Sequence, residues 1–257
     1  MNNRVFFTSI PKCGKNIIYS LFGGLGYSRH AFETERFARD AYFDKFELDN
    51  YLYPRAQLGA FDFSGFATEL GRMRPRSVFH RHLLPRSEFF AALSNAGIRP
   101  ILVVRDPRDA ALSAAHWAIA GKPEHVVAIL PSRDPKEIVR FLLRGDHDTV
   151  KFADHFDAYR DWCSNPETLV VRFEDIIGAS GGGSAERQRW IVERILNHVG
   201  ISDTQAVIAS AIDSVFNRRA GTFFKGQIGS WREFADAELN QLFEAMAGHL
   251  LETWGYE

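Results

Sequence analysis

The stretch VFFTSIPKCGKN, residues 5–16, predicts the fold of this chain. Its first half, residues 5–10, is mainly apolar, aromatic and β-branched, as expected of a short buried strand. Its second half, residues 11–16, is a turn with two lysines and one glycine, and apolar residues then recur at helical spacing up to Leu25. A strand that leads through such a turn into a helix favours an anion at the helix N-terminus, because the free N–H groups and the helix dipole both attract negative charge.

This loop is similar to a Walker A loop but departs from its pattern at both ends. Ser9 stands where the pattern begins with glycine, and Asn16 replaces the Ser or Thr hydroxyl that would hold Mg²⁺. The sequence therefore predicts a P-loop-like phosphate-binding loop that is not built for a metal-bound nucleotide. Taken alone, the pattern also fits an ordinary strand–turn–helix connection.

Three further apolar runs predict strands, at residues 77–80, 101–104 and 169–171. The run at 101–104 is continuously aliphatic, which is typical of a central strand covered on both faces, and it leads into a second basic turn at 105–109. Helical patterns alternate with the strands, over residues 86–95, 136–144, 149–163, 185–199, 203–212 and 236–254. This alternation predicts one α/β domain over residues 1–257, with a doubly wound, mainly parallel sheet that binds ligands at the carboxyl ends of its strands.

The composition is that of an ordinary soluble domain, with 46% hydrophobic and 25% charged residues and a net charge of -1. Such a small net charge does not favour nucleic acid or an anionic membrane as a partner. The two cysteines, Cys13 and Cys163, give no disulfide framework and suit a reducing cytoplasm. The sequence has no apolar run of the roughly 20 residues that a membrane span needs, no signal-peptide pattern and no metal-site spacing of Cys and His. We therefore expect a cytoplasmic protein without a membrane span or a metal.

Four motifs, in order along the chain, resemble those of the sulfotransferases that use 3′-phosphoadenosine 5′-phosphosulfate (PAPS). PKCG, residues 11–14, is similar to that family's 5′-phosphosulfate loop, usually PKSGTTW. RDPRDAALS, residues 105–113, is similar to the 3′-phosphate motif, with arginine and serine at the family's spacing. FED, residues 173–175, stands where the family has YED. KGQIGSW, residues 225–231, resembles the C-terminal RKGxxGxW loop that closes over the nucleotide.

The resemblance implies roles for individual residues. Lys12 would bind the oxygen that bridges phosphorus and sulfur and offset the charge that develops there. The N–H groups at the start of the following helix would hold the 5′-phosphate, while Arg105 and Ser113 would hold the 3′-phosphate. The residues expected to contact the nucleotide are Lys12, Cys13, Gly14, Lys15, Asn16, Ile17, Arg105, Ser113, Phe173, Phe216, Lys225 and Gly226.

Several positions depart from the family pattern. Ile17 replaces the tryptophan that stacks on adenine, and we expect Phe216 to provide the stacking instead. Lys15 and Asn16 replace two threonines, which removes two hydroxyl contacts and adds a cation. Phe173 lacks the phenol of the family's tyrosine.

The catalytic base is expected just after the strand at residues 77–80. The family often has KxHLP there, with the histidine taking the proton of the acceptor, whereas HRHLLP, residues 80–85, has one extra leucine. Histidine suits this task because its unperturbed pKa of about 6.5 lies close to physiological pH. We expect His82 to be the base and His80, at the family's lysine position, to help stabilise charge. The reverse assignment stays open.

Together these patterns predict an enzyme that moves a sulfo group from PAPS to a hydroxyl, or as a second choice an amine, of a small or medium-sized acceptor. The product nucleotide would be adenosine 3′,5′-bisphosphate (PAP). One alternative is a nucleotide-dependent phosphotransferase, which would need a Mg²⁺-binding Ser or Thr after Lys15. Another is a non-catalytic nucleotide-binding protein on the same fold. Residues 27–76 and 123–145 would contact the acceptor, but their composition does not identify it, and the sequence does not predict the oligomeric state.

Overall fold

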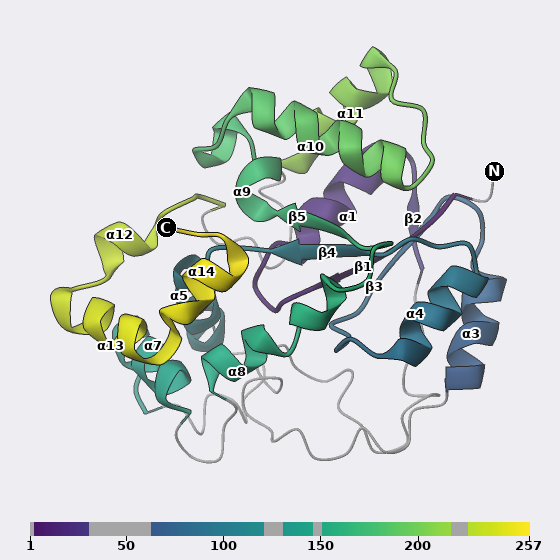
Figure 1. Ribbon diagram of the computed structural model, residues 1–257. Helices are drawn as coiled ribbons and strands as arrows, with labels where there is room; N and C mark the ends of the chain where they lie inside the picture. Colours follow the sequence, from purple (N-terminus) through teal and green to yellow (C-terminus); the bar gives the residue numbers. More distant parts are fainter. Residues whose placement is uncertain (1–2, 31–62, 121–130, 146–150, 217–225) are drawn as a thin grey trace.

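The computed structural model describes residues 3–30, 63–120, 131–145, 151–216 and 226–257. Within them, five strands form one sheet in the order β2-β3-β1-β4-β5, and every pair of neighbours is parallel. The strands are β1 (Arg4–Ser9), β2 (Ser28–Arg29), β3 (Ser77–His80), β4 (Ile101–Val104) and β5 (Leu169–Arg172). Parallel neighbours need crossover connections, and helices provide them here, so the predicted doubly wound α/β fold is confirmed (Figure 1).

Helices cover both faces of the sheet (Figure 1). One face carries α1 (Lys15–Gly24), α9 (Phe173–Ile176), α10 (Ala185–His198) and α11 (Gln205–Val215). The other face carries α3 (Phe63–Arg72), α4 (Ser87–Asn95), α5 (Pro107–Ile119), α7 (Pro135–Arg144), α8 (Phe152–Asp157), α13 (Ala237–Ala247) and α14 (His249–Trp254). Three short helices, Arg160–Trp162, Ala179–Gly181 and α12 (Trp231–Phe234), lie in the connections.

The central strand β1 contributes to the core on both faces. Phe6 packs with the cluster under α5 and α8, while Val5 and Phe7 pack with the cluster under α1 and α10. All three side chains are fully buried, because successive residues of a covered strand point to opposite faces. In the sheet register, Phe7 pairs with His80 of β3 and with Ile101 of β4.

Most predicted elements form, with differences at places where the sequence pattern is weak. The helix expected over residues 236–254 is two helices, α13 and α14, joined at Gly248, since glycine disfavours a helix interior. The helical pattern over 149–163 becomes the short α8 and a 3-10 turn. Strand β2 has two exposed residues and no apolar pattern that would predict it. Of the two regions expected to contact the acceptor, residues 31–62 and 123–130 lie outside the described residues.

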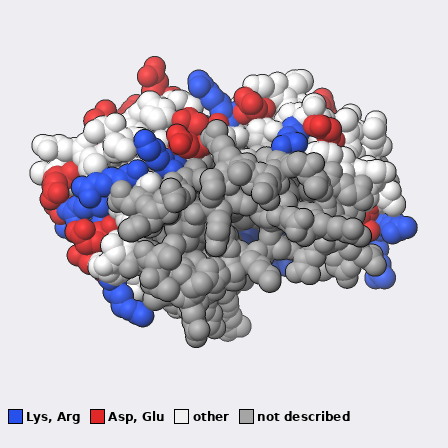
Figure 2. All heavy atoms as spheres, turned by 90° about the horizontal axis from the view of Figure 1, so that it is seen from below, with Lys and Arg blue, Asp and Glu red and all other residues white. Residues whose placement is uncertain are grey.

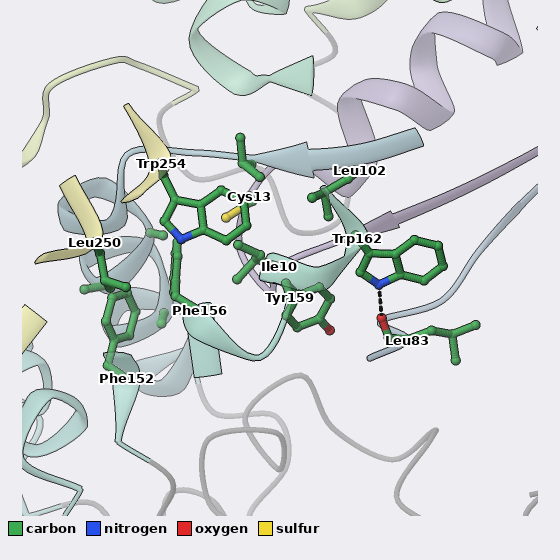
Figure 3. Close-up of a cluster of buried hydrophobic side chains, with 14 of the residues drawn as sticks. Ile10, Cys13, Leu83, Leu102, Phe152, Phe156, Tyr159, Trp162, Leu250 and Trp254 are labelled. Carbon is green, nitrogen blue, oxygen red and sulfur yellow. Dashed lines mark hydrogen bonds between the residues drawn. The ribbon is translucent and has the colours of Figure 1, made fainter. Parts of the chain in front are cut away.

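A buried cluster supports the carboxyl ends of β1 and β4 (Figure 3). It joins Ile10 and Cys13, which flank the first turn, to Leu102 of β4 and to Trp254 of α14. On the face shown in Figure 2, Lys and Arg side chains are interspersed with Asp and Glu among the described residues. No helix in the described part of the chain is long and apolar enough to cross a membrane.

Candidate active site

The phosphate loop, residues 11–16, leads from β1 into α1 with glycine at the helix N-cap. Gly14 has φ 106°, in the left-handed region that side chains rarely adopt, and no side chain caps the helix there. A Cβ on Gly14 would lie 2.8 Å from Cδ2 of Phe173, so the glycine is also required by close packing. The positive end of the α1 dipole is therefore directed at the phosphate loop, where it favours an anion.

Lys12 and Cys13, the two residues before this glycine, differ in environment. Lys12 has φ 66°, and its Nζ lies 5.1 Å from the centroid of the Trp117 ring on α5. The Cys13 side chain is fully buried and points into the core (Figure 3). Burial raises the pKa of the Cys13 thiol far above neutral pH, so this cysteine is a neutral packing residue rather than a nucleophile. The Lys12 side chain is thus directed toward α5, whereas the Cys13 side chain points into the core.

Arg105 follows β4 and is buried beside the phosphate loop. Its guanidinium carbon lies 4.2 Å from the centroid of the Phe173 ring, and its Nη2 donates to the carbonyl of Gln227 at 3.0 Å. The same nitrogen lies 3.7 Å from Oδ2 of Asp109. Within the described residues, the buried Nε–H of Arg105 has no hydrogen-bond acceptor. A buried cationic donor without an acceptor fits an anionic ligand, because an unmet donor in the interior is costly.

Asp109 joins α5 to the glycine-rich loop, residues 226–231. Its side chain is buried and accepts hydrogen bonds from the backbone N–H of Gly229 at 2.7 Å and of Trp231 at 3.0 Å. Burial raises the pKa of the Asp109 carboxyl, while Arg105 and the two N–H donors oppose that rise. The sequence analysis did not single out Asp109, although Asp109 lies within the 105–113 motif that predicted a nucleotide-binding site.

Ser113 lies on α5 between Asp109 and Trp117. It is four residues after Asp109 and four before Trp117, so the three residues share one face of the helix. Ser113 is half-buried. The face that binds the glycine-rich loop at one end therefore approaches Lys12 at the other, with the predicted serine in the middle.

His82 lies next to the end of β1 in an orientation that defines its tautomer. Its Nδ1 is 2.7 Å from the backbone oxygen of Ser9. A carbonyl oxygen only accepts hydrogen bonds, so Nδ1 of the neutral ring carries the proton and Nε2 holds the lone pair. Nε2, which is buried, is therefore the nitrogen that would accept a proton if His82 is the base.

His80 has a different setting. It is 4% exposed, and its ring packs against Phe7 at 4.6 Å and Tyr19 at 6.1 Å between centroids. Its Nε2 lies 3.0 Å from the hydroxyl of Ser9. The His80 and His82 rings meet edge to face at 4.5 Å, so the structure brings the two predicted histidines together around Ser9. Sequence analysis missed this role of Ser9, which has no motif of its own.

Leu83, the first leucine of HRHLLP, fixes the position of His82. Its carbonyl accepts a hydrogen bond from Nε1 of Trp162 at 2.8 Å (Figure 3), and its N–H donates to the Thr8 hydroxyl at 3.3 Å. The side chain of Leu83 is buried in the core. The segment after β3 is thus anchored immediately beyond His82, and the extra leucine, Leu84, follows this anchor.

Of the remaining predicted residues, three belong to the hydrophobic cluster that includes α1, and two begin that helix. Ile17 is buried, and Phe216, the C-cap of α11, packs against the same hydrophobic cluster. Phe173 begins α9 and belongs to this cluster too. Lys15 and Asn16 form the first turn of α1. Lys225 lies outside the described residues, and Gly226 begins the described part of the glycine-rich loop with φ 61°.

Comparison with known proteins agrees with this arrangement. The sulfotransferase domain family matches residues 2–255. No curated protein matches the chain at a significant level. Among solved structures, the chain is similar to mouse sulfotransferase SULT7A1 complexed with PAP, with 17% sequence identity and a TM-score of 0.63, over 98% of this chain and 85% of that chain.

A second similar structure is retinol dehydratase in complex with androsterone and the inactive cofactor PAP. Its sequence identity is 16% and its TM-score 0.58, with 97% of this chain and 81% of that chain covered. At such low identity the likeness to solved structures supports the fold alone. The family match extends over nearly the whole chain, and the chain therefore belongs to the sulfotransferase domain family.

Proposed function

We propose that this sulfotransferase moves a sulfo group from PAPS to a hydroxyl group of a small or medium-sized acceptor and releases PAP. The observation that carries the proposal is the pairing of two anion sites at the carboxyl ends of adjacent strands. One is the N-terminus of α1 after β1, and the other is the buried Arg105 after β4. A nucleotide with phosphate groups on both its 3′ and 5′ positions needs two such sites.

The described residues fit this nucleotide. The first turn of α1, which follows a glycine N-cap, would hold the 5′-phosphate, and the Nε–H of Arg105, which has no acceptor within the described residues, would bind the 3′-phosphate together with Ser113. Phe173 contacts both sites, since it packs on Gly14 and under Arg105. The solved structures of SULT7A1 and retinol dehydratase, both with PAP, support the same nucleotide here.

When bound, PAPS supplies the activated sulfo group, and the protein contributes positioning and charge. Lys12 would offset the negative charge that develops on the leaving phosphate oxygen. Nε2 of His82 would take the proton of the acceptor hydroxyl, and the imidazolium that forms keeps its Nδ1–H bond to the Ser9 carbonyl. His80, whose Nε2 lies 3.0 Å from the Ser9 hydroxyl, would hold the Ser9 side chain and the His82 ring in position rather than transfer the proton.

Two alternatives remain distinct from this proposal. A phosphotransferase would need a hydroxyl at position 16 for Mg²⁺, and Asn16 has none. A non-catalytic nucleotide-binding protein would bind PAP but show no turnover. We place the protein in the cytoplasm, as a proposal that rests on two free cysteines, Cys13 and Cys163.

Thermal unfolding with different nucleotides tests the cofactor. PAP should raise the Tm more than ADP or ATP at equal concentration, and Mg²⁺ should not be needed, because a ligand that binds the folded state stabilises it by mass action. A larger shift with ATP and Mg²⁺ than with PAP would favour the phosphotransferase. Turnover of PAPS with a panel of phenols, alcohols and amines then separates the enzyme from the non-catalytic binding protein.

A further inference from the structure

The C-terminal segment, residues 254–257, lies beside the carboxyl ends of β4 and β5 (Figure 1). Arg172, at the end of β5, donates from Nη2 to the backbone oxygen of Trp254 at 3.1 Å and stacks over the Tyr256 ring at 4.9 Å. Arg108, in the first turn of α5, donates to the backbone oxygen of Glu257. The segment therefore contacts one arginine within the 105–113 motif and another directly before the 173–175 motif.

Glu174 connects this segment to the turn that contains Arg105. Its Oε1 accepts a hydrogen bond from the backbone N–H of Asp106 at 2.9 Å, and its Oε2 accepts one from the hydroxyl of Tyr256, also at 2.9 Å. Burial raises the pKa of Glu174, and these two donors favour its charged form. The two bonds thus go to different carboxylate oxygens, and the backbone N–H of Glu174 also favours the charged form, so loss of the Tyr256 hydroxyl removes one of three donors from a half-buried carboxylate.

The position of Asp106 matters because it is the residue next to Arg105 and the N-cap of α5. Its side chain accepts from the backbone N–H of Arg108 at 2.9 Å and pairs with the Arg108 guanidinium at 2.7 Å. Arg108 in turn stacks over the Trp231 ring at 3.9 Å. A shift of Asp106 would consequently move both the start of α5 and Arg105, the residue before Asp106.

We propose that Tyr256 is a positioning residue for recognition of the 3′-phosphate. Through Glu174 it holds the Arg105–Asp106 turn in the conformation that directs the Arg105 side chain to the nucleotide. This inference rests on the proposed function, since it presumes that Arg105 binds a 3′-phosphate. Tyr256 lies 151 positions after Arg105 in the sequence and outside the four motifs, so no local pattern assigns it this role.

Binding of two nucleotides to Tyr256→Phe tests the proposal. The variant keeps the ring that stacks with Arg172 and removes only the hydroxyl. Measured by calorimetry, its affinity for PAP should fall about fivefold, the equivalent of one ordinary hydrogen bond. Its affinity for AMP, which has no 3′-phosphate, should change less than twofold. The ratio of the two affinities is the decisive readout, because general loss of stability would weaken both nucleotides alike.

A matched control is Tyr27→Phe, which removes another buried phenol, hydrogen-bonded to the Asn3 side chain, and should leave both affinities unchanged. A second route is Gly255→Ala, because Gly255 has φ 69° and a Cβ there would collide with Arg172. Its control, Gly200→Ala, introduces the same backbone strain at φ 70° where a Cβ meets no neighbour. Gly255→Ala should lower the PAP-to-AMP affinity ratio, and Gly200→Ala should not.

An unchanged ratio in both Tyr256→Phe and Gly255→Ala would overturn the role of Tyr256 while leaving the proposed function intact. A wild-type protein that binds PAP no more tightly than AMP would instead contradict the proposed function, and this inference with it. The two failures are therefore distinguishable within one set of measurements.

Discussion

Asp109→Ala removes the carboxylate that joins α5 to the glycine-rich loop. Two backbone donors, on Gly229 and Trp231, lose their acceptor, and Arg105 loses a partner at 3.7 Å. A hydrogen bond to a charged group contributes roughly 1.5–3 kcal/mol. The two bonds together therefore contribute about 3–6 kcal/mol before the desolvation cost of the carboxylate is subtracted. Burial of the carboxylate, which raises the pKa of Asp109, offsets part of this. We expect a net loss of about 2–4 kcal/mol of folding stability.

Thermal unfolding measures this loss, and about 2–4 kcal/mol corresponds to a Tm decrease on the order of 4–16 °C in a domain of this size. PAP affinity should fall at least about tenfold, because the loop whose Gln227 carbonyl contacts Arg105 loses its bonds to α5 at Gly229 and Trp231. The control is Asp134→Ala. Asp134 is an exposed N-cap of α7 that accepts from the N–H of Lys136, and its loss should cost only about 1 kcal/mol and leave PAP binding unchanged. Equal effects of the two variants on stability and PAP binding would refute the reasoning.

Three further predictions concern the phosphate sites and pH. Arg105→Ala should weaken PAP binding by roughly 1.5–3 kcal/mol in calorimetry, and wild-type affinity would place the 3′-phosphate elsewhere. Gly14→Ala should lower both Tm and PAP affinity because of the positive φ and the contact with Phe173, whereas Gly23→Ala, at an open position in the last turn of the same helix, should keep PAP affinity and match or exceed the wild-type Tm. Burial lowers the pKa of His198 in the folded state, so the unfolded chain binds the proton first and stability falls as pH drops below about 6.5. In urea unfolding, His198→Gln should show a smaller decline from pH 7 to pH 5, and an undiminished decline would assign the effect to other groups.

Much of the fold was predictable because a covered parallel strand leaves a continuous apolar run. Strands β3, β4 and β5 lie where such runs predict them, and the order of strands and helices follows. The exceptions have local reasons. The two residues of β2 are exposed and carry no apolar period, so their pairing with β3 depends on the sheet rather than on their own sequence. Gly248 interrupts a helical pattern that is otherwise continuous from α13 to α14.

The site was predictable only as far as each motif extends. Residues in the loop and turn motifs, such as Lys12 and Arg105, lie at the strand ends where the sequence places them. The groups that hold them were not predictable, because their partners are distant in sequence. Asp109 bonds to a backbone N–H 120 residues away, and Ser9 contacts His80 across 71 residues. Such contacts form only when the chain folds and leave no local period or spacing to read.

The sequence also left two histidines as rivals for the base. Their spacing of two residues places both side chains on the same side of an extended segment, so it does not indicate which histidine is the base. The structure distinguishes their surroundings instead: His80 packs on Phe7 and Tyr19, whereas His82 is oriented by the Ser9 carbonyl. This difference supports His82, and the assignment of the base remains a prediction for kinetics.

The most direct measurement is transfer of labelled sulfo groups from PAPS to an acceptor by wild type, His82→Ala and His80→Ala, with PAP binding measured in parallel. Wild type should transfer label in the absence of Mg²⁺. His82→Ala should lower kcat by about 10²–10⁴ with nearly unchanged PAP affinity, since it removes a proton acceptor and no phosphate contact. His80→Ala should lower kcat less. Wild type that binds PAP but transfers no label to any phenol, alcohol or amine would contradict the enzyme, and a fully active His82→Ala beside an inactive His80→Ala would contradict the assigned base.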